Sequence, residues 1–114
     1  MGAISRFTGS NTYTIGDSQS YVSDGAYITH PSYIVNNTVN GSLHLDLVVI
    51  DDDVSITAPS EMTEIYYDTV STPSSAAMGL YQNQISSGES SNGSDYIMGA
   101  SSVCFIFSFI INPI

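Results

Sequence analysis

The sequence contains no lysine and a single arginine, Arg6, against eleven acidic residues, which gives a formal net charge of −10. Lysine and arginine are the side chains with which proteins hold phosphates, nucleic acids and anionic lipid head groups. One arginine near a terminus cannot build any of these sites. The shortage of basic residues therefore excludes nucleic acid and anionic membrane surfaces as expected partners.

Cysteine is also nearly absent, because Cys104 is the only one. It cannot form a disulfide within the chain. Cys104 lies in an apolar run with no basic neighbour to stabilise a thiolate, so we expect a buried, unreactive thiol.

Long hydrophobic runs are missing as well. The longest apolar stretch, 103–111, has nine residues and includes Ser108. A transmembrane helix needs about twice that length. The N-terminal residues contain no continuous apolar stretch, so we expect no signal peptide.

The residues that are present favour a folded, weakly charged domain. Hydrophobic residues make up 42% of the 114 positions and include eight Tyr and four Phe, whereas charged residues make up only 11%. The usual charged fraction is about 25%. Serine and threonine, 20 and 9 in number, take their place. This length suits one domain, 1–114, and a hydroxyl- and tyrosine-rich surface resembles those of virion, fibre and secreted proteins.

Alternating hydrophobicity predicts β-strands. In 42–50, Leu43, Leu45 and Leu47 alternate with polar residues, which predicts a strand whose buried face carries the leucines. Asn40-Gly41 separates this segment from the β-prone segment 32–39, and such a dipeptide between two β-prone runs predicts a two-residue hairpin.

Shorter segments complete the predicted fold. Pro31 and Pro59 are expected to end two of the strands, and a strand is favoured over a helix in 61–70. The predicted fold is all-β, a small antiparallel β-sandwich or barrel with at most one short helix. The expected segments are a flexible arm at 1–11, strands at 12–15, 19–22, 26–30, 54–58 and 61–70, a short helix or further strand at 75–85, a flexible loop at 86–95 and a C-terminal strand at 102–111.

The C-terminal strand is the most hydrophobic part of the chain, and it is apolar on both faces. Such a strand is expected to be buried on both faces. It either forms the centre of its own sheet or leaves the subunit and completes the sheet of a neighbour. The residues predicted to make assembly contacts are Val103, Phe105, Phe107, Phe109 and Ile111.

The densest acidic cluster is Asp51, Asp52 and Asp53, interpreted as a solvated turn between strands. The alternative is a Ca²⁺ site, although the cluster lacks the alternating ligand spacing and the glycine of an EF-hand loop. A zinc site would require His44 and Asp46, which share a strand face, to meet His30. We predict no cofactor.

Catalytic motifs are absent from the sequence. There is no Gly-x-Ser-x-Gly nucleophile elbow, no phosphate-binding loop and no dinucleotide-binding glycine pattern. Glu61 and Glu64 are interpreted as surface residues rather than as a catalytic pair. We therefore expect a protein that is not an enzyme.

These features lead to a structural role as the first hypothesis. The chain is expected to be a virion component, a capsid decoration (cement) protein or a small tail or fibre protein of a phage, assembled in the host cytoplasm. Its partners would be further copies of itself and a major capsid or tail protein. The alternative is an extracellular filament or appendage subunit, joined to its neighbours by exchange of the C-terminal strand. An acidic mimic of nucleic acid is disfavoured. Such mimics space their carboxylates regularly, whereas the eleven acidic residues of this chain are scattered.

Overall fold

The structure is a computed structural model that describes residues 10–32, 35, 39–85 and 95–113, with the backbone alone for 10–15 and 83–85. These residues form eight strands and no helix. The strands are β1 (Ser10–Val22), β2 (Tyr27–His30), β3 (Ser42–Ile50), β4 (Ile56–Thr57), β5 (Thr63–Ser71), β6 (Ser74–Ile85), β7 (Tyr96–Ser102) and β8 (Cys104–Pro113).

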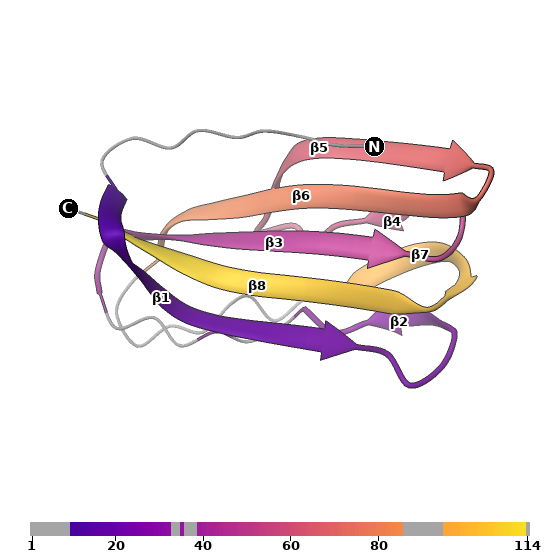
Figure 1. Cartoon of the computed structure of the whole chain (residues 1–114), viewed down its shortest axis with the longest axis horizontal. Coiled ribbons are helices and arrows are strands. Elements are labelled where there is room, and N and C mark those ends of the chain that lie inside the picture. The colour runs from indigo at the N-terminus through magenta and orange to yellow at the C-terminus, as the bar shows by residue number, and fades with distance from the viewer. Residues whose placement is uncertain (1–9, 33–34, 36–38, 86–94, 114) are drawn as a thin grey trace.

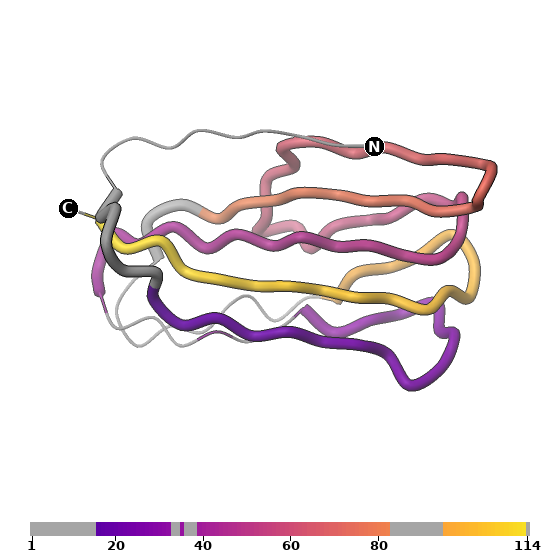
Figure 2. Tube along the Cα trace, viewed as in Figure 1, coloured from indigo at the N-terminus to yellow at the C-terminus, as the bar shows by residue number. Residues whose placement is uncertain are grey.

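Two antiparallel sheets make up the fold. The large sheet has the strand order β1-β8-β3-β6-β5, and the small sheet has the order β2-β7-β4. The large sheet lies in front of the small one in Figure 1, and the chain passes between the sheets where β7 ends and β8 begins (Figure 2). The prediction of an all-β, antiparallel sandwich is confirmed, and the segment 75–85 is a strand rather than a helix.

The predicted hairpin at Asn40-Gly41 is wrong. Gly41 does adopt a turn conformation, with a φ of 80° that favours glycine. However, β3 pairs with β8 on one side and with β6 on the other, so it has no free edge for a strand from 32–39. Most of 32–39 lies outside the described residues. The turn signal was local, whereas the pairing is decided by strands far away in the sequence.

The inward face of β3 is not the predicted one. Ser42, His44 and Asp46 point between the two sheets and are at most 1% exposed, whereas Leu47 points outward and is 40% exposed. Leu45 shares the outward face but is buried there, at 7% exposure. Val48 and Ile50 share the inward face with the polar residues. Because both faces of this strand carry apolar side chains, alternation alone could not tell which one faces the core.

The core lies between the sheets and is built largely from aliphatic, methionine and aromatic side chains. Each such side chain contributes about 1.5–3 kcal/mol when it is fully buried. The buried cluster consists of Val48, Ile50, Ile56, Met62, Ala76, Met78, Leu80, Tyr96, Met98, Cys104 and Ile106.

Most other strand predictions are confirmed. β2 ends at His30, immediately before Pro31, and 61–70 forms β5. The strands predicted at 12–15 and 19–22 are parts of one strand, β1, whose register against β8 shifts between Ile15 and Ser18. A bulge of this kind absorbs an extra residue without ending the strand. The predicted loop lies outside the described residues except for Asp95. The predicted arm 1–11 lies outside them up to residue 9, and its last two residues are wrong as an arm, because they begin β1.

The described residues contain no helix that is long and apolar enough to cross a membrane.

Candidate functional site

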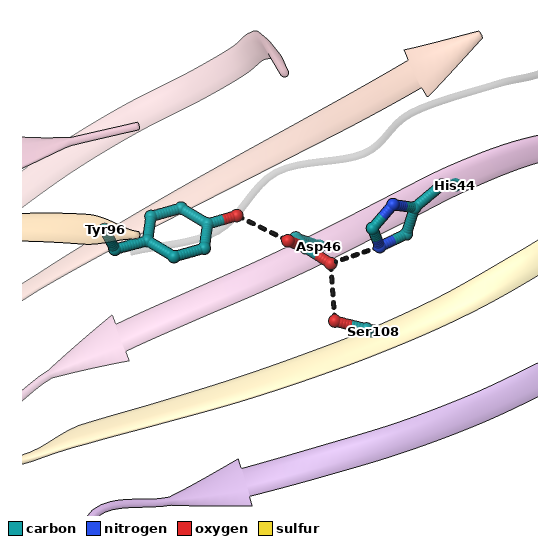
Figure 3. Close-up of polar contacts among 4 residues, drawn as sticks. All are labelled: His44, Asp46, Tyr96 and Ser108. Atoms are coloured by element: carbon teal, nitrogen blue, oxygen red, sulfur yellow. Dashed lines mark hydrogen bonds and ion pairs between the residues drawn. The ribbon is translucent and has the colours of Figure 1, made fainter. Parts of the chain in front are cut away.

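A buried polar cluster lies at the centre of the sandwich (Figure 3). Nε2 of His44 donates to Oδ1 of Asp46 at 2.7 Å, and the Ser108 hydroxyl donates to the same oxygen at 2.5 Å. The Tyr96 hydroxyl donates to Oδ2 of Asp46, also at 2.5 Å. The Asp46 carboxylate therefore accepts from three side chains on three different strands.

The strand register explains why these side chains meet. His44 and Asp46 are two residues apart on β3 and so point to the same side. Ser108 on β8 is the cross-strand partner of Asp46. Tyr96 is the first residue of β7 and reaches across from the small sheet (Figure 3). The cluster thus ties β3 and β8 to the opposite layer.

Burial sets the electrostatics of this cluster. All four side chains are at most 1% exposed. Burial, the neighbouring Asp46 charge and the hydrogen bond to Asp46 raise the pKa of Tyr96 well above its usual range. A carboxylate removed from water is costly unless its oxygens accept hydrogen bonds. The donors from His44, Tyr96 and Ser108 offset that cost.

Two buried atoms next to the cluster have no hydrogen-bond partner, namely Nδ1 of His44 and Oε1 of Gln82. Gln82 on β6 is the cross-strand neighbour of His44. Since the carboxylate can only accept, the His44 ring carries a hydrogen on Nε2.

The cluster lacks the geometry of a hydrolytic triad. In such a triad the histidine stands between serine and aspartate and takes the serine proton. Here the carboxylate stands between them, and the Ser108 hydroxyl points to Asp46 rather than to His44. The four side chains are also closed off from solvent. This arrangement can fix strands in place, but it holds no activated nucleophile.

The second histidine has a separate structural role. Nε2 of His30 donates to the carbonyl oxygen of Ser102 at 2.9 Å, and the Tyr21 hydroxyl lies 3.3 Å from Nδ1. His30 is fully buried and links β2 to β7. Among the described residues no group of three or more His, Cys, Asp or Glu side chains could hold a metal ion. The convergence that a zinc site at His30 and His44 would need is therefore not found there.

The acidic turn uses its carboxylates for local hydrogen bonds. Oδ1 of Asp51 accepts from the backbone N–H of Val103 at 2.8 Å, which joins the end of β3 to the corner between β7 and β8. Oδ1 of Asp52 accepts from the hydroxyl of Ser74 at 3.2 Å and from the backbone N–H of Asp53 at 3.1 Å. Asp51, Asp52 and Asp53 lie in the turn between β3 and β4, as interpreted from the sequence. Ca²⁺ binding there stays the untested alternative to the prediction of no cofactor.

Cys104 is buried, as expected. Its side chain is 1% exposed and belongs to the core. Burial raises the pKa of the Cys104 thiol to about 12. The thiol is therefore protonated at neutral pH and unreactive.

The predicted assembly residues lie mainly on one surface. Phe105, Phe107, Phe109 and Ile111 alternate along β8 with the buried residues and point away from the small sheet. The rings of Phe107 and Phe109 are 5.5 Å apart. Val103 lies at the corner before β8 and is partly exposed.

Neighbouring strands extend this surface, which we call the outer face. Cross-strand register places the outward residues of β1, β3 and β6 beside those of β8. The outer face consists of Ser18, Ser20, Val22, Leu43, Leu45, Leu47, Val49, Ala77, Gly79, Tyr81, Phe105, Phe107, Phe109 and Ile111.

Tyr96 and Ser108 belong to the buried cluster, although neither was predicted as a site residue. Ser108 did leave a signal, because it interrupts the apolar stretch 103–111 on the face shared with Cys104 and Ile106. Tyr96 left none, since it is one of eight tyrosines and 50 residues from Asp46.

Comparisons with protein-family models, with curated proteins and with solved structures found no match to this chain.

Proposed function

We propose that this protein is a non-enzymatic structural protein of a virion, either a capsid decoration (cement) protein or a small tail or fibre protein of a phage. It acts by burying surface against neighbouring subunits. The observation that carries the proposal is the outer face, where the most hydrophobic strand of the chain exposes Phe105 to 41%. Exposed apolar patches of several hundred Å² mark interaction sites.

The internal chemistry supports a contact role. The buried cluster around Asp46 is closed to solvent, and its hydroxyls and imidazole are used to hold strands together. The reactive side chains of this cluster are thus unavailable to a substrate, whereas the outer face is available to a partner. Contacts must come from apolar and tyrosine side chains, since the chain has one basic residue.

The alternative of a filament built by exchange of the C-terminal strand gains less support. β8 is an interior strand of the large sheet, hydrogen-bonded to β1 and β3 of its own chain. Withdrawing it would expose Ile106 and Ile110 and separate Ser108 from Asp46. A purified chain that polymerises with rising concentration would favour the filament.

The test is to locate the protein in native material. Antibodies raised against the purified chain would be applied to gradient-purified particles and examined by immunogold electron microscopy. We expect label at regular positions on shells or tails. Label restricted to cell-surface filaments or to the unsedimented fraction would overturn the proposal, and an antibody against an unrelated acidic protein is the matched control.

A further inference from the structure

We propose that the outer face binds a second copy of this chain, so that two large sheets pack face to face around a twofold axis. This inference rests on the proposed function, because it names the partner for the subunit contacts that the function requires. It concerns the surface opposite to the buried cluster around Asp46.

The first observation is the apolar character of the exposed rows. Cross-strand partners on the outer face form rows that run from one strand to the next. In one row Val22 on β1, which is 65% exposed, lies beside Phe105 on β8, and Phe105 lies beside Val49 on β3. The next row runs from Ser20 through Phe107 to Leu47. A strand that is apolar on both faces is normally buried on both. In the described part of the chain, Phe105 of β8 and its outer-face neighbours Val22 and Val49 stay open to solvent, so this row is available for a cover.

The second observation is the distribution of charge. None of the residues of the outer face is charged, although the chain carries eleven acids. Asp68 lies at the rim, on the edge strand β5 beside Ala77. A basic partner would find no acid to pair with on this face. A second copy brings the same uncharged surface, so two chains of net charge −10 can meet here without burying a charge.

The third observation is size. The four strands that carry the outer face, about 4.8 Å apart and nine residues long, present a surface of roughly 19 by 30 Å, about 600 Å². A standard interface takes about 800 Å² from each partner. A face that matches itself is also what a twofold dimer requires, because the same patch is used on both subunits. The sheets would pack about 10 Å apart, as in a β-sandwich.

Salt dependence distinguishes this dimer from charge-driven binding. Two chains with a net charge of −10 repel each other at low ionic strength, and salt screens that repulsion. The apolar contact itself does not depend on charge pairing. Association should therefore strengthen as salt is added, whereas binding to a basic partner would weaken.

Sedimentation velocity of the full chain over a wide range of concentration and salt tests the proposal. The test variant is Leu47→Asp, which places a carboxylate in the middle of the outer face. The matched control is Ile97→Asp, because Ile97 is 50% exposed but points outward from the small sheet. We expect a dimer for the wild type and for Ile97→Asp, and for Leu47→Asp a dissociation constant higher by roughly tenfold or more.

Circular dichroism and thermal melting would verify that both variants fold, and Leu47→Ser replaces Leu47→Asp if the latter does not. A wild-type chain that is monomeric at all concentrations and salts would overturn the dimer, as would equal weakening by both variants. If such a monomer still labels virus particles, the dimer fails while the proposed function stands. If a dimer forms but no particle is labelled, the dimer stands and the virion role fails.

Discussion

The two faces of β3 and β8 differ in polarity and in exposure. The inward face is buried and mixes a histidine, an aspartate and three serine or cysteine side chains with Val48, Ile50, Ile106 and Ile110. The outward face carries leucine, valine, phenylalanine and isoleucine, several of them substantially exposed. Both faces are therefore apolar in part, and the inward one also encloses hydrogen-bonded polar groups. The difference indicates that burial between the sheets follows from hydrogen-bond matching as well as from hydrophobicity.

Hydrogen-bond matching explains the choice of inward face. The buried Tyr96 hydroxyl of the small sheet needs an acceptor. Asp46 supplies it, and Ser108 donates to the same carboxylate, which a phenylalanine could not do. With Asp46 and Ser108 inward, the two-residue period of the strands places Leu47 and Phe107 on the outer face, where a second subunit can cover them.

The largest expected effect comes from removing the centre of the buried cluster. Asp46→Ala leaves the donors of His44, Tyr96 and Ser108 without their acceptor, and each buried donor left unpaired costs about 1–3 kcal/mol. We expect the free energy of unfolding, measured by urea titration, to fall by about 3 kcal/mol or more. Asp68→Ala, at an exposed edge position, should change it by less than about 0.5 kcal/mol. A small loss for Asp46→Ala would show that the inward polar face is not structural.

Alkaline pH should destabilise the fold through the inward face. The folded pKa of Cys104 is about 12, above its ordinary value of 9.0, so the unfolded chain loses this proton first as pH rises. The contribution of Cys104 to the free energy of unfolding is therefore fully present below pH 9. It is lost as the pH rises toward 12, and the loss amounts to up to about 4 kcal/mol. Tyr96 acts in the same direction. Between pH 9 and 12 the melting temperature should fall less steeply for Cys104→Ala than for the wild type. The same fall in both proteins would show that Cys104 does not cause the alkaline loss of stability.

Adjacent valines on β3 offer a matched test of the two faces. Val48 is fully buried, whereas Val49 points outward and is 45% exposed. Val48→Thr places a hydroxyl in the core and should cost about 1–3 kcal/mol. Val49→Thr should cost less than about 0.5 kcal/mol in the monomer. Urea unfolding at low protein concentration would measure the free energy of unfolding of both variants. Equal losses would mean that Val49 is as buried as Val48.

The smallest expected effect on the free energy of unfolding comes from adding a methyl group at Gly79 on the outer face. A Cβ at Gly79 would lie 2.5 Å from Cε1 of Tyr66, whose ring covers this position from β5. Because Tyr66 can swing away, Gly79→Ala should cost only about 1 kcal/mol.

The Tyr66→Ala variant provides the matched background for this substitution. There, Gly79→Ala should be close to neutral, because the clashing ring is gone. A double-mutant cycle by thermal or urea unfolding measures the coupling. No coupling between the two positions would show that the ring does not cover Gly79.

Much of the fold could be predicted from local patterns. The pattern in 42–50 and 103–111 indicated strands, and the proline after His30 marked the end of β2. The ends of the C-terminal strand were wrong by two residues, because β8 runs over Cys104–Pro113 rather than 102–111. The hairpin at Asn40-Gly41 and the inward face of β3 could not be predicted, because both depend on which distant strands lie alongside β3. The cluster partners Tyr96 and Ser108 lie 50 and 62 residues from Asp46 and share no spacing with it.

The sequence by itself determined the period of the strands, the all-β class and the scarcity of basic side chains, since these are properties of neighbouring residues and of composition. The tertiary structure decided which face of β3 and β8 is enclosed. That choice depends on the register that sets Ser108 opposite Asp46 and on the small sheet that brings Tyr96 to the same carboxylate. A buried carboxylate needs all of these donors at once, and no local pattern specifies partners from three strands.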